Sequence, residues 1–435
     1  MKRLISQVLC AVLLLSLAGC AQVMPAPQTA PPTEPTEPPT QPVVEVTMEN
    51  EKAERLYEDV ELEYWTMLSE QDPEAAVLQQ AAAVFKQTTG AKVNLNWMAD
   101  RQEEPEQILS GDLRVDLFEV TGDELEQGLT QYALALTDLA DAADYSEKSW
   151  GVLRKQILSR FGELKAVALR PHLYGMYYNQ DRFDELGIDA TPGTWEEYIT
   201  FCQMLKDAGY EALVIDQERA NLLLELHMER ALGWEDLKET MVYARWWQNE
   251  MASTMVQVAI RFAEDGYVVK GTPDTYPEGQ NRLIQSNAML VAGSERLCAE
   301  VEQSTMMQAN WGVFPYPGDG PGTGLLVDAD LLVVSTDCAE PEAAFDFAML
   351  LATGEFDQLR ADIVKGIPAD PANTSPINGA NICMDYATPH GPKWFQEEQN
   401  LLFTRLWNGW YKTGSYFIEQ LNGLSRSFAH LKSVG

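Results

Sequence analysis

Strand and helix patterns alternate along the first part of the body of this chain. Residues 60–65 alternate apolar and polar side chains, which is typical of a strand. Apolar side chains then recur at helical spacing up to Gly90, and we expect Asp72 to cap this helix and Pro73 to be its first residue. Strands are expected again at residues 91–97 and 116–120. This alternation predicts an α/β fold in which helices cover a largely parallel sheet.

Mixed strand and helix patterns continue through the rest of the chain. Thr194 and Glu197 have the spacing of a capping box, and Cys202 falls on the apolar face of the helix that they begin, which favours a buried thiol. Helical patterns dominate residues 221–262, and the tail after residue 392 is largely helical and rich in aromatic side chains. Strands are expected at residues 288–291, 311–314 and 331–335, and a further helix at 341–351.

The first fifty residues carry an export signal and a tether. Lys2 and Arg3 precede an apolar run that ends in Leu-Ala-Gly-Cys20, and this run is shorter than the roughly 20 residues of a membrane-spanning helix. The ending matches the bacterial lipobox, at which Cys20 receives diacylglycerol; an ordinary signal peptide with a chance cysteine is the alternative. Residues 1–19 are thus a predicted signal peptide. Residues 20–50, rich in Pro, Thr and Glu, are a predicted disordered tether.

This arrangement places the body on the outer face of the cytoplasmic membrane, anchored through lipid at Cys20. The hydrophobic content of 46% supports substantial cores, and the net charge of −35 argues against binding to nucleic acid. The four cysteines of the body are scattered without a CxxC pair, and the four histidines lack metal-ligand spacing. Neither a GxSxG elbow nor a phosphate-binding loop occurs. We therefore expect no cofactor and no metal.

A series of short segments follows a characteristic order along the body. They are residues 62–65, 85–93, 177–183, 187–189, 194–198, 276–281, 288–289, 293–294, 311–312, 315–317, 341–344 and 367–369. In this order they resemble the extracellular solute-binding proteins of bacterial ABC importers, specifically the sugar-binding group that includes maltose-binding protein. The resemblance covers most of residues 60–370 and is weak in the tail.

The resemblance implies a two-lobed, periplasmic-binding-protein-like fold with crossover hinge strands between the lobes. Carried onto this chain, one lobe would hold residues 60–168 with 294–365, and the other 169–293 with 366–435. A monomer of this kind captures a sugar or oligosaccharide in the cleft, closes, and delivers it unaltered to a membrane permease. It performs no chemistry.

Two candidate ligand contacts follow from position in the predicted sheet. Aromatic rings suit the apolar faces of a sugar, and fixed polar groups suit its hydroxyls. Trp65 and Glu119 lie near strand ends, where open α/β sheets place ligand crevices. Core packing for Trp65 and a solvated position at the sheet edge for Glu119 are the alternatives.

Further candidates come from the resemblance. Arg170, Tyr174 and Tyr177 lie on the first crossover, where relatives carry Pro-Tyr-Arg; this chain has Ala168 and Leu169 but retains the arginine. Arg170 could bind hydroxyls or a carboxylate, or pair with a nearby acid. Asp328 follows the glycine-rich loop at 318–324, which in relatives approaches the cleft. Trp311 and Trp410 are candidate rings for stacking, with core packing as the alternative.

One position departs from the family pattern. After Gly-Ser294, many relatives carry a tryptophan that stacks on sugar, whereas this chain has Glu295. Either the ligand is more polar or cationic, or stacking comes from elsewhere, or Glu295 points to water and pairs with Arg296. A secreted hydrolase that uses two of the acids Glu119, Glu295, Asp328 and Asp330 is the rival function, and a surface adhesive protein is a third.

Overall fold

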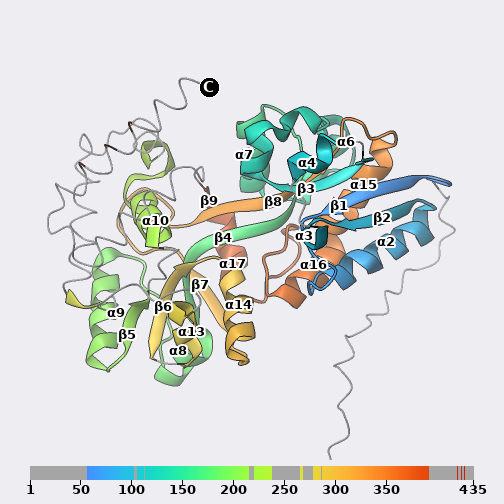
Figure 1. The fold of residues 1–435 in the computed structure, drawn as a ribbon. Coiled ribbons are helices and arrows are strands. Elements are labelled where there is room, and N and C mark those ends of the chain that lie inside the picture. The colour runs from blue at the N-terminus through green and yellow to red at the C-terminus, as the bar shows by residue number, and fades with distance from the viewer. Residues whose placement is uncertain are drawn as a thin grey trace, which may run out of the picture. The chain divides into compact units, whose positions relative to one another are not determined.

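The computed structural model describes residues 56–390 except 102–104, 112, 215–219, 238–264, 268–277 and 286, together with residues 419, 423 and 426. The nine strands within these residues form one mixed sheet in the order β2-β1-β3-β8-β4-β6-β5, with β7 paired to β4 and β9 paired to β8 (Figure 1). The predicted α/β class is confirmed.

The first strands of the sheet are parallel, as the alternation predicts. β1 (Glu61–Thr66) pairs in parallel with β2 (Lys92–Trp97) and with β3 (Leu117–Thr121). α2 (Ala75–Thr89) connects β1 to β2 and ends at Gly90, whose φ is 91°. The helix begins two residues later than the predicted start at Pro73. The reason is that the Asp72 carboxylate accepts a hydrogen bond from the preceding Ser69 N–H instead of capping the helix.

One strand, β4 (Val167–Asn179), changes partners along its length. Its first part pairs antiparallel with β8 (Leu326–Val334), and its last part pairs with β6 (Ala288–Gly293) and β7 (Trp311–Phe314). A shift in register after Ala168 takes up the irregularity, so the strand continues through Pro171.

Gly175 lies where β4 exchanges one partner for the others. A Cβ atom at this position would lie 3.0 Å from Leu325 Cδ2, 3.0 Å from Val313 Cγ2 and 3.2 Å from Phe314 O. The close approach of three strands therefore depends on the missing side chain.

The remaining helices flank this sheet, and the remaining short strands belong to it (Figure 1). The helix that begins after Thr194 has the predicted capping box, with Glu197 N–H donating to Thr194 Oγ1 and Thr194 N–H donating to the Glu197 carboxylate. The elements are α3 (Met98–Arg101), α4 (Pro105–Leu109), α5 (Gly122–Glu124), η1 (Leu125–Leu129), η2 (Thr130–Tyr132), α6 (Thr137–Ala142), η3 (Tyr145–Glu147), α7 (Gly151–Phe161), α8 (Gln180–Leu186), α9 (Trp195–Asp207), β5 (Glu211–Val214), α10 (Ala220–Leu232), α13 (Glu278–Gln285), α14 (Arg296–Thr305), α15 (Pro341–Ala352), α16 (Gly354–Val364), α17 (Ala380–Tyr386) and β9 (Thr388–Pro389).

Two hydrophobic clusters form the core. The larger one contains Tyr64, Phe118 and Phe347 and extends to residues of α13 and β6. The smaller one contains Tyr198 and Cys202 and joins α9 and α10 to other residues of β6. The Cys202 thiol is fully buried, which confirms that prediction, and the described cysteines form no disulfide.

Several predictions fall on residues that the structure does not describe. They include the signal peptide, Cys20, the tether, most of the helical stretch after Leu232 and the tail with Trp410. Within the residues that the structure does describe, no helix has both the length and the apolar character needed to cross a bilayer.

Candidate functional site

A polar stripe crosses the middle of the sheet. Because side chains alternate along a strand, Arg170, His172 and Tyr174 share one face of β4. The antiparallel register pairs His172 with Asp328 and Arg170 with Asp330, so both aspartates of β8 project from that same face. This register concentrates ionisable side chains where β4 and β8 run side by side.

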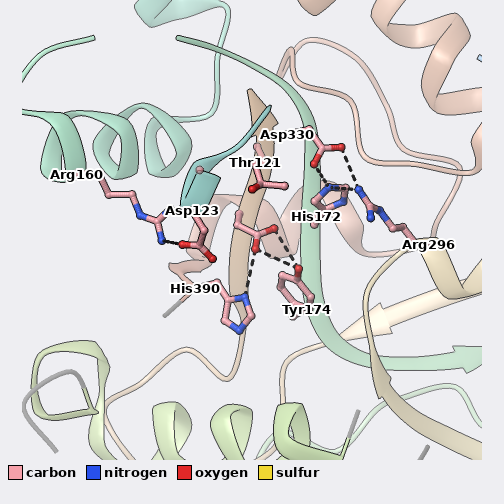
Figure 2. Close-up of a pocket in the computed structure, with 11 residues that line it drawn as sticks. Thr121, Asp123, Arg160, His172, Tyr174, Arg296, Asp330 and His390 are labelled. Carbon is pink, nitrogen blue, oxygen red and sulfur yellow. Dashed lines mark hydrogen bonds and ion pairs between the residues drawn. The ribbon is translucent and has the colours of Figure 1, made fainter. Parts of the chain in front are cut away.

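A pocket of about 220 Å³ lies over part of this stripe (Figure 2). Its lining draws on β3, α5, α7, β4, α14, β8 and the residue after β9. The lining residues are Thr121, Gly122, Asp123, Arg160, His172, Tyr174, Arg296, Asp328, Ala329, Asp330 and His390. Most are charged or hydrogen-bonding groups, which suits a ligand rich in polar groups.

Asp328 and its neighbours form one wall of the pocket. The Tyr174 hydroxyl lies 3.1 and 3.2 Å from the two carboxylate oxygens of Asp328, and His390 Nδ1 lies 3.3 Å from Oδ2. On its other side, His390 Nε2 lies 2.9 Å from Glu225 Oε2 of α10. Burial alone would lower the pKa of His390, but the charges of Glu225 and Asp328 raise it to about 10. His390 is therefore a cation at neutral pH.

A second histidine, His172, lies at the opposite wall between two carboxylates, with Arg296 Nη2 2.7 Å from its Nε2. His172 Nδ1 lies 2.7 Å from Glu295 Oε1, and His172 Nε2 lies 3.3 Å from Asp330 Oδ1. Although burial opposes its charge, Asp330 and Glu295 raise the pKa of His172 to about 10. Arg296 Nη2 donates to Asp330 Oδ2 at 3.0 Å, while more than half of the Arg296 side chain stays exposed. Arg296 thus presents donors to the pocket.

Burial raises the pKa of both aspartates of β8, but the cations around them outweigh it. The hydrogen bond from His390 and the charges of His172 and His390 hold the pKa of Asp328 below its ordinary value. His172 and Arg296 do the same for Asp330. Both carboxylates are ionised acceptors at neutral pH.

Arg170 and Glu119, two predicted ligand contacts, lie buried beside the pocket and are not among its lining residues. Arg170 Nη1 donates to Glu119 Oε2 at 2.9 Å, and Arg170 Nε donates to Glu74 Oε2 at 2.7 Å. Glu119 also accepts from the Tyr64 hydroxyl, Thr66 Oγ1 and the Met67 N–H. The ion pair that the sequence offered as the alternative for Arg170 is present, and these contacts occupy both carboxylate oxygens of Glu119.

Three predicted aromatic contacts are buried away from the pocket lining. Trp65 donates through Nε1 to Arg114 O, and Arg101 lies over its ring at 4.8 Å. The Tyr177 hydroxyl donates to Leu173 O at 2.7 Å. Trp311 donates to Glu302 Oε1 at 2.9 Å. Each ring packs in the core with its polar atom satisfied. The structure brings Tyr174 and Asp328 of the predicted set to the pocket, and Trp410 lies outside the described residues.

Glu295 takes a role that none of the three sequence interpretations described. It is 4% exposed and accepts from His172 and from the Leu173 N–H at 3.0 Å. It neither points to water nor pairs with Arg296, because Arg296 reaches Asp330 instead. Glu295 therefore holds His172, a residue of the pocket lining, in position.

The glycine-rich loop at residues 318–324 packs against α10. Arg230 donates to Gly318 O, and the Glu229 carboxylate accepts from Thr323 N–H at 3.0 Å. A Cβ atom would lie 2.3 Å from Arg230 O at Gly320 and 1.7 Å from Glu229 O at Gly322. The glycines are needed because the loop backbone touches the helix backbone. In the described part of the chain, no group of side chains suits a metal ion.

Sequence reasoning missed His172, His390 and Arg296 as lining residues. One signal was available for His172, because the polar residues at 170, 172 and 174 alternate with Pro171 and Leu173 in an otherwise apolar strand. His390 and Arg296 arrive from distant segments, and no local pattern marks them.

A pocket lined by fixed polar groups is typical of a protein that binds a polar solute. Residues 69–355 match the family model of the bacterial extracellular solute-binding proteins, and the chain belongs to this family. Proteins of this family bind solutes without catalysis, so the chain is a binding protein and not an enzyme.

Solved structures share the fold at low sequence identity. Apo RafE from Streptococcus pneumoniae has a TM-score of 0.70 and 17% identity, covering 86% of this chain and 98% of that one. The bacterial solute receptor AcbH has a TM-score of 0.65 and 16% identity, covering 85% and 99%. The sugar transporter BL01359 from Bacillus licheniformis, in complex with stachyose, has a TM-score of 0.58 and 15% identity, covering 84% and 100%. A search of curated proteins gives no significant match.

Proposed function

We propose that this protein is the lipid-anchored substrate-binding subunit of an ABC importer, and that it binds a sugar or oligosaccharide in the pocket described above. Family membership supports capture of a solute outside the cytoplasm. The ligands of structural neighbours support sugars: raffinose for RafE, stachyose for BL01359 and β-D-galactopyranose for AcbH.

The pocket chemistry is the observation within this chain that carries the sugar proposal. Asp328 is an ionised acceptor with a side chain that is one-third exposed, and Arg296 offers donors nearby. A sugar hydroxyl both donates and accepts, so one ring could use both groups. The half-buried Tyr174 ring supplies an apolar surface at the same wall. We therefore propose Tyr174, Asp328 and Arg296 as ligand contacts.

The pocket also supports capture by hinge closure. With the lobe boundaries proposed from the sequence, Asp123, Asp328 and Arg296 belong to one lobe, and His172, Tyr174 and His390 belong to the other. A ligand that touches both sets binds the closed form better and shifts the population toward it. The closed form is what a permease would receive.

Anchoring at Cys20 completes the proposal. The tether after it, at about 3 Å per residue for proline-rich chain, would let the body reach the permease while staying at the membrane. Cys20→Ala is expected to move the exported protein from the membrane fraction to the medium or periplasm. Retention of the variant at the membrane would count against the lipid anchor.

A polar cationic solute is the second candidate ligand, favoured by the ionised and partly exposed carboxylate of Asp328. Asp330 is paired with His172 and Arg296, and Asp123 with Arg160, whereas the Asp328 side chain is one-third exposed at the pocket. An amine could pair with Asp328 where a neutral sugar would only donate a hydrogen bond.

Ligand-induced stabilisation tests these proposals. The purified protein is heated with galactose, raffinose, stachyose, glucosamine or lysine, and the products are analysed. We expect at least one of the sugars to raise the melting temperature and to be recovered unaltered. Stabilisation by glucosamine and lysine alone would replace the sugar proposal with the cationic one, and no stabilisation by any compound would contradict both.

A further inference from the structure

The contact of His390 with two carboxylates reaches from the pocket into a helix that does not line it. Asp328 faces the pocket, His390 lies between Asp328 and Glu225, and Glu225 is 3% exposed on α10. Among the described residues, Glu225 from α10, Asp328 from β8 and Tyr174 from β4 face the imidazole, the last with ring centroids 4.5 Å apart.

This geometry fixes the protonation of the ring. Ionised carboxylates only accept hydrogen bonds, and a neutral imidazole carries a single N–H. Both ring nitrogens of His390 lie within hydrogen-bond distance of a carboxylate oxygen, at 2.9 and 3.3 Å. Both contacts are hydrogen bonds only if the ring carries two protons, which agrees with its raised pKa.

We propose that Glu225 and His390 are positioning residues for ligand binding: they hold the Asp328 carboxylate, ionised and in a fixed orientation, as the acceptor for donor groups of the ligand. Glu225 maintains the charge of His390, and His390 with Tyr174 fixes Asp328 from two sides. The inference rests on the proposed function, because it explains how the Asp328 carboxylate of that pocket is oriented before the ligand binds.

We call the chain of contacts from Glu225 through His390 to Asp328 the relay. Glu225→Gln tests it with a small change in the shape of the side chain. The amide can still donate to His390 Nε2, so the ring can stay in place and donate from Nδ1 to Asp328, but the charge that stabilises imidazolium is gone. The buried ring then loses its second proton near neutral pH. Glu229→Gln is the matched control. Glu229 is buried on the same helix, four residues further on, but it bonds Thr323 and Thr388.

The first measurement is the dissociation constant of whichever of galactose, raffinose and stachyose binds the unaltered protein most tightly, from pH 5.5 to 8. The unaltered protein and Glu229→Gln are expected to show flat profiles. Glu225→Gln is expected to bind roughly tenfold more weakly at pH 8, the scale of one charge-assisted hydrogen bond, and to recover as the pH falls and His390 regains its proton. A purely structural role for Glu225 would weaken binding equally at every pH, and that result, or unchanged binding, overturns the proposal.

The second measurement separates this inference from the proposed function. Proton NMR of the imidazole in the sugar-free protein is expected to show no titration of His390 below pH 8, and a titration within pH 5.5 to 8 in Glu225→Gln. If none of the three sugars binds but the NMR result holds, the sugar proposal fails and the charged relay stands. Titration of His390 near pH 6.5 in the unaltered protein would refute the relay.

Discussion

Arg170 forms a bidentate ion pair with Glu119, in which Nη1 lies 2.9 Å from Oε2 and Nη2 lies 3.3 Å from Oε1. The pair joins β4 to β3 at the end of the polar stripe, where both side chains are buried. These two residues, which were predicted to bind ligand, therefore form a buried ion pair within the fold.

Removing the arginine of this pair is expected to destabilise the protein strongly. Arg170→Met leaves Glu119 and Glu74 buried without their cation, which costs about 3–5 kcal/mol. Urea unfolding would measure the loss. Arg182→Met, which breaks an exposed pair with Glu185, is the control and should cost at most about 1 kcal/mol. Equal losses for the two variants would contradict the buried pair's importance.

Gly175→Ala is expected to crowd the point where β4 changes partners. The added methyl would press on Leu325 and Val313 at 3.0 Å, and overpacking of this kind costs about 1–3 kcal/mol. Gly151→Ala is the control, because a Cβ there meets nothing within 4 Å. Thermal unfolding of both variants checks the prediction, which fails if Gly175→Ala is as stable as the control.

His227 should make the fold sensitive to acid. Desolvation lowers the pKa of this half-buried ring to about 4, below its ordinary value of about 6.5 in the unfolded chain. The unfolded state therefore takes up the proton first, and stability is lost as the pH falls from about 6.5 to 4. His227→Phe, which removes the titrating ring, is expected to reduce this loss when unfolding free energies are compared across that range. An unchanged slope would show that His227 is not the source.

His172 should make stability depend on pH in the opposite direction. Its pKa of about 10 in the folded protein exceeds the unfolded value, so its stabilisation is complete below about pH 6.5 and is lost as the pH rises through 10. Unfolding free energies of the wild type are expected to fall between pH 7 and 10, and those of His172→Gln to fall less. Parallel profiles for the two proteins would count against a charged His172.

Asp328→Asn is expected to weaken ligand binding without unfolding the protein. The change removes the ionised acceptor but keeps the shape, and a lost charge-assisted bond is worth roughly tenfold in affinity. Calorimetry with the sugar that stabilises the wild type gives the affinity. Asp138→Asn removes the same charge from an exposed site on α6 and should bind as the wild type does. Equal binding by Asp328→Asn would remove this residue from the proposed site.

The sequence predicted best where structure is decided locally. The alternation of β1, the apolar spacing of α2 and the capping box of Thr194 depend on neighbours within a few residues, and all three are confirmed. The predicted start of α2 was two residues too early, because the Asp72 carboxylate accepts a hydrogen bond from the Ser69 N–H, and no spacing rule reveals that donor.

Roles that depend on distant partners could not be read from the sequence. Glu119 looked like a ligand contact because acidic residues are rare in apolar strands. Its true partner, Arg170, lies 51 residues away, where no local pattern links the two. Glu295 likewise acquires its role only when α14 places it beneath His172. Tyr174 was found because it lies on the first crossover, and Asp328 because it follows the glycine-rich loop that approaches the cleft in relatives, while His390 lies beyond the last segment that resembles the family.

The loop at residues 318–324 looks like a flexible connector by composition, yet its geometry makes it one of the least replaceable stretches of the described chain. With Gly320 and Gly322 in backbone contact with α10, even alanine would force the helix and the loop apart. Tolerance to mutation should therefore be lower in this exposed-looking loop than on the outer faces of the neighbouring helices, and a library randomised here would return glycine at both positions.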